Sequence, residues 1–302
     1  MLTEEAVRAT LETLKTGRTA QIQAELKQMK SESEELEKRA QHSTKELARI
    51  LGEQGINVDA LRAVNDSKEK LSERLDRIKS RLKDLARQPV NEGPSLIAAL
   101  SVTNLGNVSA AQCPPLHLTP YYTAAYGPSG NQVLGEYYAG RIDVKIEATG
   151  TGEGLFGGGA GRGCVTVDRW FFFLVSDVTR YYSFSVYEPY YGFYLVEAHD
   201  GFLSSKEANV KIETAIRAYQ YNWKSKKEYP VLSVGGRNIN TGARYDDTDL
   251  FYYAELLGAG DVAYLLVSQR FCVYARGGSS YSELNFDDGS GNYLPAPYVY
   301  VY

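Results

Sequence analysis

Apolar residues recur with a seven-residue period between residues 61 and 85. Two interleaved sets of positions carry Leu, Val or Ile, except that Lys68 occupies one of them. This spacing is typical of the narrow apolar stripe of a left-handed coiled coil, which one helix cannot bury alone. Lys68 fits if its aliphatic stem packs and its ammonium group reaches solvent, or it could set the register. The sequence therefore predicts an oligomeric helical stalk with the seam positions Leu61, Val64, Leu71, Leu75, Ile78, Leu82 and Leu85.

A longer helix is predicted ahead of this seam. Apolar residues from Val7 to Ile50 are mostly three or four positions apart, as on one face of a helix. Two glycines within residues 52–59 interrupt the pattern, so residues 1–90 are expected to form two helices with a hinge there. The helices could run end to end in a parallel stalk or fold back as an antiparallel hairpin, and the regular second seam favours the stalk.

The pattern changes after two prolines within residues 88–94, which end the second helix. From residue 135 onward, short segments of alternating apolar and polar residues are separated by turn residues, which is typical of β-strands. About eight to ten strands without crossover helices indicate an antiparallel sandwich of the jelly-roll type. The predicted fold is an α-helical coiled-coil arm (residues 1–90), a linker or collar (91–134) and a tyrosine-rich all-β head (135–302).

Composition separates the same parts of the chain. Its 24 Tyr, 10 Phe and 2 Trp all follow residue 120, so the arm contains no aromatic side chain. The arm holds 18 basic and 16 acidic residues, which leaves 15 basic and 21 acidic residues for the rest. Phosphate contacts need clustered Lys and Arg, so an acidic head and an arm of interleaved charges argue against a nucleic-acid partner.

Three cysteines, Cys113, Cys164 and Cys272, are too scattered for a zinc site or a dense disulfide framework. Reduced thiols are favoured over a single bridge, as in a protein made in a reducing compartment. The N-terminus lacks a basic segment followed by an apolar core, and the longest apolar run, residues 170–175, is too short to cross a bilayer. We therefore expect a soluble cytoplasmic product without a classical signal peptide or transmembrane segment, and leave open its later release or association with a particle.

No set of residues typical of catalysis is evident. The glycine-rich residues 154–163 lack both the Lys-Ser/Thr pair and the following helix of a phosphate-binding loop. The histidines are isolated, and the Asp-rich segments 246–249 and 285–292 lack the spacing of a helix-loop-helix calcium site. We expect no enzymatic activity, no metal and no cofactor.

Tyrosine gives the strongest indication of function. Five Tyr-Tyr pairs occur, and neighbouring side chains of a strand point to opposite faces, so one ring of a pair is expected in the core and the other outside. Packing in the core or between subunits explains most rings, while exposed ones are suited to recognising a sugar or a protein. Exposed rings beside turn carboxylates would provide both stacking and hydrogen-bond acceptors, which makes Tyr245, Asp247 and Tyr252 the candidate ligand-binding residues.

Two short motifs occur in the head. Residues 187–194 read Tyr-Glu-Pro-Tyr-Tyr-Gly-Phe-Tyr, and residues 259–262 read Ala-Gly-Asp-Val before an apolar strand. They resemble the strand entries of the C1q and tumour-necrosis-factor type of jelly-roll head. Such heads commonly sit on trimeric coiled coils, so the resemblance implies a homotrimer, and no catalytic residue carries over from it.

These observations favour a non-enzymatic, oligomeric stalk-and-head protein whose β-sandwich binds a cell-surface glycan or protein, similar in plan to a fibre, adhesin or lectin-like attachment protein. A first alternative is a structural subunit that docks into a larger assembly through its coiled coil. A second alternative is a pore-forming toxin with a membrane-active helical hairpin, which the highly charged arm disfavours. Glycan binding separates the first two, and leakage from liposomes identifies the third.

Overall fold

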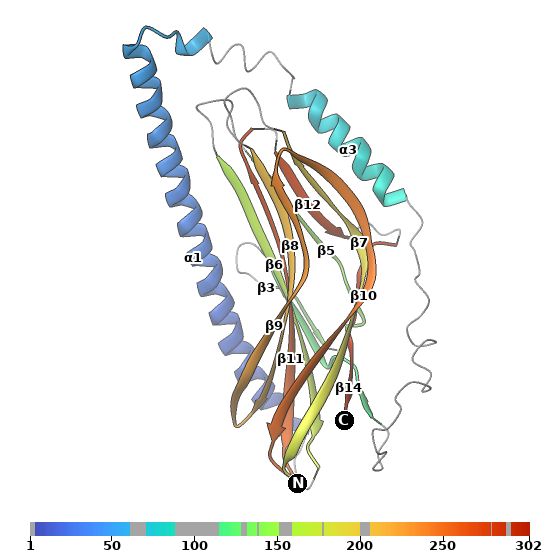
Figure 1. Ribbon diagram of the computed structural model, residues 1–302. Coiled ribbons are helices and arrows are strands. Elements are labelled where there is room, and N and C mark those ends of the chain that lie inside the picture. The colour runs from blue at the N-terminus through green and yellow to red at the C-terminus, as the bar shows by residue number, and fades with distance from the viewer. Residues whose placement is uncertain are drawn as a thin grey trace.

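Two helices and fourteen strands make up the described part of the chain in a computed structural model (Figure 1). The helices are α1 (Glu4–Glu53) and α3 (Leu71–Arg87). Helix α1 ends within the glycine-containing segment where the sequence predicts an interruption, and a short helical stretch resumes at residue 58. The structure describes residues 4–60, 71–87, 115–127, 132–137, 139–150, 159–176, 178–199, 206–278, 280–287 and 291–302.

Two antiparallel sheets form the β-body. The strands of the first sheet are β1 (Leu116–Leu118), β5 (Val144–Thr149), β7 (Arg180–Ala198), β10 (Ile239–Leu257), β12 (Tyr281–Phe286) and β14 (Tyr298–Val301). Their order is β1-β14-β7-β12-β5, and β10 pairs with the other edge of β7 over its whole length.

The strands of the second sheet are β2 (Tyr122–Tyr126), β3 (Gln132–Tyr137), β6 (Ala160–Leu174), β8 (Glu207–Gln220), β9 (Asn222–Arg237) and β11 (Val262–Arg276). Their order is β3-β2-β6-β11-β8-β9, and the short strands β4 (Arg141–Ile142) and β13 (Leu294–Pro295) pair separately. A helix followed by a sandwich-like body of antiparallel sheets is therefore confirmed, while the coiled coil and the jelly-roll likeness stay predictions.

The two sheets bury the apolar residues that alternate along their strands. In β5 and β8 every second residue is buried, as expected for strands with one face in the core. In the middle of β6 and β11 nearly every residue is buried, because these strands are covered on both faces. The other sheet covers the inner face, and helix α1 covers the outer face.

Helix α1 packs against its own β-body, which differs from the predicted stalk. The buried residues of its N-terminal half share an apolar cluster with aromatic residues on the outer face of the second sheet. The arm has no aromatic residues of its own, and this aromatic sheet face supplies the partner that its apolar stripe requires. The helix residues of this cluster are Val7, Leu11, Leu14, Ile22 and Leu26, and those of the sheet include Tyr122, Tyr126, Trp170, Tyr264 and Leu266.

Helix α3 lies on the opposite side of the sandwich, against the first sheet (Figure 1). Leu82 packs against Leu195 and Tyr281, and Leu85 is buried beside Gly242. A Cβ atom at Gly242 would lie 2.9 Å from Leu195 Cδ1 and 3.4 Å from Leu85 Cδ1, so this close approach needs glycine. The end of the predicted seam thus contacts the chain's own sheet.

The other seam positions give no information on this contact. Leu61 and Val64 lie outside the described residues, and so do the side chains of Leu71, Leu75 and Ile78. Helices α1 and α3 pack on different sheets with the β-body between them, so their described parts do not pack against each other as a hairpin would require, and the oligomeric stalk stays a prediction.

The head begins earlier than residue 135, the boundary that the sequence indicates. Strand β1 pairs with β14, and β2 lies between β3 and β6 in the second sheet. Residues 116–126, predicted to belong to a collar, are therefore part of the sandwich. The sequence around β1 and β2 is polar and contains prolines, so it does not indicate these two short strands, whose partners β14 and β6 are distant in the sequence.

The expectation of three reduced thiols is wrong for two of them. Cys164 and Cys272 form a disulfide between β6 and β11, where the register places them directly opposite each other. The two residues are 108 positions apart, so only the strand register reveals the pairing. Among the described helices, none is long and apolar enough to cross a membrane.

Candidate functional site

Two of the Tyr-Tyr pairs divide between the core and the surface as the strand alternation predicts, whereas both rings of the pair Tyr121-Tyr122 are buried. In β7, Tyr181 is 70% exposed and Tyr182 is 4% exposed. In β10, Tyr252 is 61% exposed and Tyr253 is 3% exposed. Tyr182 and Tyr253 belong to the core between the sheets, which leaves Tyr181 and Tyr252 on the outer face of the first sheet.

The strand register brings further tyrosines onto the same outer face. Ser185 of β7 pairs with Tyr252 on one side and with Tyr300 on the other. Paired residues of neighbouring strands point to the same face of a sheet, so these side chains share one layer. We call this surface the tyrosine face, and it consists of Tyr181, Tyr187, Tyr252, Tyr298, Tyr300 and Tyr302, of which Tyr187 is buried beneath its neighbours.

Contacts between rings hold part of the tyrosine face in place. The rings of Tyr187 and Tyr298 are stacked with centroids 4.8 Å apart, and Tyr300 meets Tyr187 edge-on at 5.8 Å. His117 of β1 lies 5.2 Å from the Tyr300 ring, which extends the aromatic layer to the sheet edge. Such offset and edge-to-face pairs add to the stability that burial alone provides.

Burial keeps the hydroxyls of Tyr187 and Tyr298 protonated at neutral pH. Burial and, to a smaller extent, the nearby Tyr302, Tyr252, Tyr298 and Tyr300 together raise the pKa of Tyr187 to about 12. Burial likewise raises the pKa of Tyr298. The face therefore combines flat apolar rings with neutral hydroxyl groups that both donate and accept hydrogen bonds.

The three residues singled out from the sequence are not brought together. In β10, Tyr245 and Asp247 lie on the inner face, whereas Tyr252 lies on the outer face. The hydroxyl of Tyr245 donates to Asp249 Oδ2 at 2.9 Å, and its ring lies 5.4 Å from buried Tyr190. Burial and the charge of Asp249 raise the pKa of Tyr245. Tyr245 is thus part of the packing of the sandwich, and only Tyr252 belongs to the tyrosine face.

Asp247 is exposed on β10, and its Oδ1 accepts a hydrogen bond from the Thr248 amide at 2.7 Å. The adjacent Asp246 lies on the outer face and pairs with Arg244 at 2.6 Å, near helix α3. The Asp-rich stretch of β10 therefore belongs to a strand, where successive carboxylates point to opposite sides.

The sequence analysis missed the tyrosines of β14. Residues 298–302 read Tyr-Val-Tyr-Val-Tyr, and this period of two places three rings on one face of a strand. These three tyrosines alternate with valines, so they are not among the adjacent Tyr-Tyr pairs. That β14 lies beside β7 follows from the fold and not from the local sequence.

A polar cluster lies inside the sandwich, between its two apolar cores. Glu188 Oε2 accepts hydrogen bonds from Tyr190 at 2.6 Å, from Thr214 at 2.6 Å and from Gln269 at 3.2 Å. Arg169 donates to the Gln269 side chain. Burial raises the pKa of Glu188 and lowers the pKa of Arg169 to about 10. All five side chains are buried, so a ligand could not reach them without separating the sheets.

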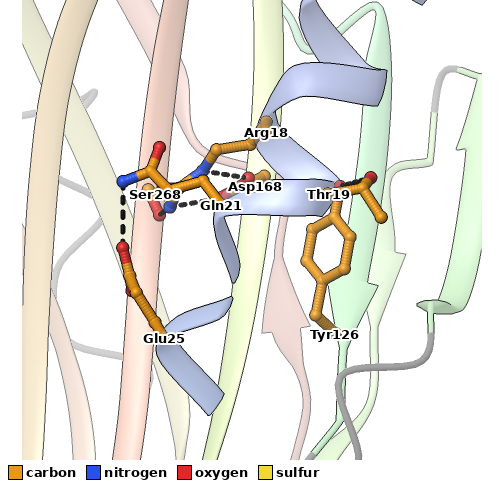
Figure 2. Close-up of polar contacts among 7 residues, drawn as sticks. All are labelled: Arg18, Thr19, Gln21, Glu25, Tyr126, Asp168 and Ser268. Carbon is orange, nitrogen blue, oxygen red and sulfur yellow. Dashed lines mark hydrogen bonds and ion pairs between the residues drawn. The ribbon is translucent and has the colours of Figure 1, made fainter. Parts of the chain in front are cut away.

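Polar contacts also fix helix α1 on the second sheet (Figure 2). Arg18 Nε donates to Asp168 Oδ2 at 2.9 Å, and Arg18 Nη2 donates to Ser268 Oγ at 3.0 Å. The hydroxyls of Thr19 and Tyr126 are 3.3 Å apart, and burial raises the pKa of Tyr126 to about 12. Asp168 is buried, and a buried carboxylate is stable only with such a partner, so this pair helps to define where α1 docks.

The described residues contain no group of three His, Cys, Asp or Glu side chains that could hold a metal ion. No protein-family model matches the chain, and no curated protein matches it. Several solved structures share weak likeness with it.

The carbohydrate-binding module TmCBM61, solved with β-1,4-galactotriose, is 9% identical over 60% of this chain and 87% of its own, with a TM-score of 0.20. The enzymatically active domain of bacteriophage CBA120 tailspike protein 4 is 8% identical over 53% of this chain and 19% of its own, with a TM-score of 0.16. The isomalto-dextranase of Arthrobacter globiformis T6, solved with panose, is 10% identical over 62% of this chain and 32% of its own, at 0.16. TM-scores this low establish neither a shared fold nor a shared function.

Proposed function

We propose that this chain is a non-enzymatic recognition protein that binds a neutral glycan of a cell surface through its tyrosine face. The observation that carries the proposal is the gathering of six tyrosines from β7, β10 and the C-terminal segment on one sheet surface. A sugar ring has an apolar C–H face that stacks on aromatic rings and hydroxyls that exchange hydrogen bonds with tyrosine hydroxyls.

The absence of charge on this face favours a neutral ligand. On the outer side of residues 181–189 of β7 and 248–256 of β10, every second residue is Tyr, Ser, Pro, Thr, Leu or Ala. None of these described residues carries a charged side chain at neutral pH. A basic or acidic protein surface would find no complementary charge here, whereas a neutral sugar needs none.

Presentation of several tyrosine faces by a homotrimer is part of the same proposal, because multivalency strengthens weak single-site binding. The heptad pattern supports it. Leu82 and Leu85 already pack on the first sheet, so the seam would rest on residues 61–78. Sedimentation equilibrium measures this directly, since a trimer has three times the 33.5 kDa mass of the chain. A monomer would remove the trimer from the proposal and leave the binding face.

A glycan array probed with the full chain, followed by calorimetry with the best neutral glycan, tests the binding proposal. We expect the double variant Tyr181→Ala with Tyr252→Ala to bind at least tenfold more weakly. Tyr221→Ala is the matched control, because Tyr221 is equally exposed and lies on the turn between β8 and β9, in the other sheet.

Two results would overturn the proposal. The first is an array on which no glycan binds, and the second is an equal loss of affinity in the Tyr221 control. If the double variant instead loses its native mass in solution, the tyrosine face is a subunit interface, as the structural-subunit hypothesis requires. Leakage from liposomes caused by the full chain would support the toxin hypothesis.

A further inference from the structure

A cavity lies on the other side of the sandwich from the tyrosine face, between helix α1 and the outer face of the second sheet. Its volume is about 230 Å³. An engineered apolar cavity of about 150 Å³ holds a benzene molecule, so this space is large enough for a substituted six-membered ring. The residues that matter here are Leu14, Arg18, Arg217, Trp223, Lys226 and Leu266.

The walls of the cavity are apolar and aromatic. Leu14 and Leu266 are buried residues of the core between α1 and the second sheet, and Trp223 packs against that core. The Trp223 ring is held by Tyr219, edge-on at 5.4 Å, and by Trp170 at 5.9 Å. These side chains provide a rigid apolar surface against which a ring can pack.

Among the described residues, the cavity is lined by three cationic side chains, Arg18, Arg217 and Lys226, and by no carboxylate. Arg18 is neutralised by buried Asp168, to which it donates, as Figure 2 shows. Lys226 pairs with Glu228, but both side chains are exposed, and such a pair contributes little. Within the described residues, no carboxylate forms an ion pair with Arg217.

Among the described cations that line the cavity, Arg217 lacks the carboxylate partner that Arg18 and Lys226 have. Its guanidinium lies over the Trp223 ring, 4.3 Å from the centroid, and its Nε donates to the Lys224 carbonyl at 3.3 Å. Partial burial lowers the pKa of Arg217, and the positive charge of Arg18 lowers it further. Both guanidinium groups line one partly desolvated space, and Arg18 already has a carboxylate partner, so an anion placed there would pair with Arg217.

We propose that the cavity binds a small, ring-bearing carboxylate, with its carboxylate on Arg217 and its ring against Trp223 and Leu266. The planar fork of an arginine matches the two oxygens of a carboxylate and can hold both. The site is separate from the tyrosine face, because α1 and the second sheet form it, whereas the tyrosine face belongs to the first sheet. An acidic sugar and an aromatic acid share this chemistry, and the probes distinguish them.

Calorimetry on the full chain with glucuronate and with benzoate tests the proposal, and glucose and benzyl alcohol are the uncharged counterparts. We expect one of the two anions to bind, its uncharged counterpart to bind at least tenfold more weakly, and salt to reduce the affinity. Arg217→Gln should reduce the affinity at least tenfold. Arg237→Gln is the control, because Arg237 is an exposed arginine at the far end of β9.

The proposal fails if neither anion binds at millimolar concentration, or if the uncharged counterpart binds equally well. It also fails if folded Arg217→Gln, checked by circular dichroism, keeps the affinity of the original chain. The double variant Tyr181→Ala with Tyr252→Ala should retain anion binding, because its substitutions lie on the other sheet. This result separates a failure of the cavity proposal from a failure of the tyrosine-face proposal.

Discussion

Replacing Leu11 with Ala tests whether helix α1 and the β-body share one core. Leu11 is 1% exposed and belongs to the cluster that includes Trp170, Tyr264 and Leu266. Alanine is at least as good a helix former as leucine, so the substitution leaves the helix itself intact. Any loss of stability therefore reports the contact between helix and sheet.

The expected loss is large. Truncation of a fully buried leucine to alanine costs about 2–5 kcal/mol, because transfer free energy is lost and a cavity remains. With a slope of about 3 kcal/mol/M, this shifts the midpoint of urea unfolding by about 1 M. Ile50→Ala on the same helix is the control, because Ile50 is 43% exposed and should change stability by less than about 0.5 kcal/mol.

Two probes follow the same transition. Both tryptophans of the chain, Trp170 and Trp223, lie in or against the cluster under α1, so their fluorescence reports helix docking. Far-ultraviolet circular dichroism reports the helices and strands of the chain together. A shared core predicts that both midpoints coincide and move together in Leu11→Ala. An unchanged midpoint in this variant would refute the docking of α1 and restore a free helical arm.

Three further predictions concern the β-body. Tyr245→Ala should lower the free energy of unfolding by about 2–4 kcal/mol, because it removes a packed ring and the hydrogen bond to Asp249. The variant should keep its affinity for the glycan. A loss of affinity at unchanged stability would contradict this prediction. Because burial raises the pKa of Glu188, the contribution of this group to stability is fully present below the ordinary Glu pKa and is lost as pH rises through the folded-state pKa. Urea midpoints should show this slope in the original chain and a shallower one in Glu188→Gln, and equal slopes would oppose it. Replacing Cys164 and Cys272 with Ser should cost about 2–5 kcal/mol, and thiol titration of the native chain should find one free thiol instead of three.

The helices and strands of this fold can largely be predicted from the sequence, but the elements against which they pack or pair cannot. The spacing of apolar residues predicts helix α1 and the strand-like segments around Ile142 and Val210. An apolar stripe indicates that one face of a helix is buried, but it does not identify the surface that covers this face. The apolar run at residues 170–175 indicates the surface that covers helix α1, because a strand that is apolar on both faces must be covered on both faces.

The candidate site shows the same limit. Nearness in the sequence to the carboxylates of residues 246–249 singles out Tyr252, and strand alternation sends it outward while Tyr253 enters the core. The same alternation places Tyr245 on the other side of β10, because an odd number of positions separates Tyr245 from Tyr252. Tyr298 and Tyr300 join the site only because β14 pairs with β7, and such long-range register is set by the whole sandwich.

The two helices explain why the tyrosine face remains available. Helix α1 covers the outer face of the second sheet, and α3 covers the end of the first sheet near Leu195 and Tyr281. The opposite end of the first sheet keeps Tyr181 and Tyr252 exposed. The chain thus buries aromatic residues beneath one helix and apolar residues beneath the other, while a third apolar area stays open to solvent. Large exposed rings grouped on one face are typical of binding surfaces, so this end of the first sheet is where we expect a partner to bind.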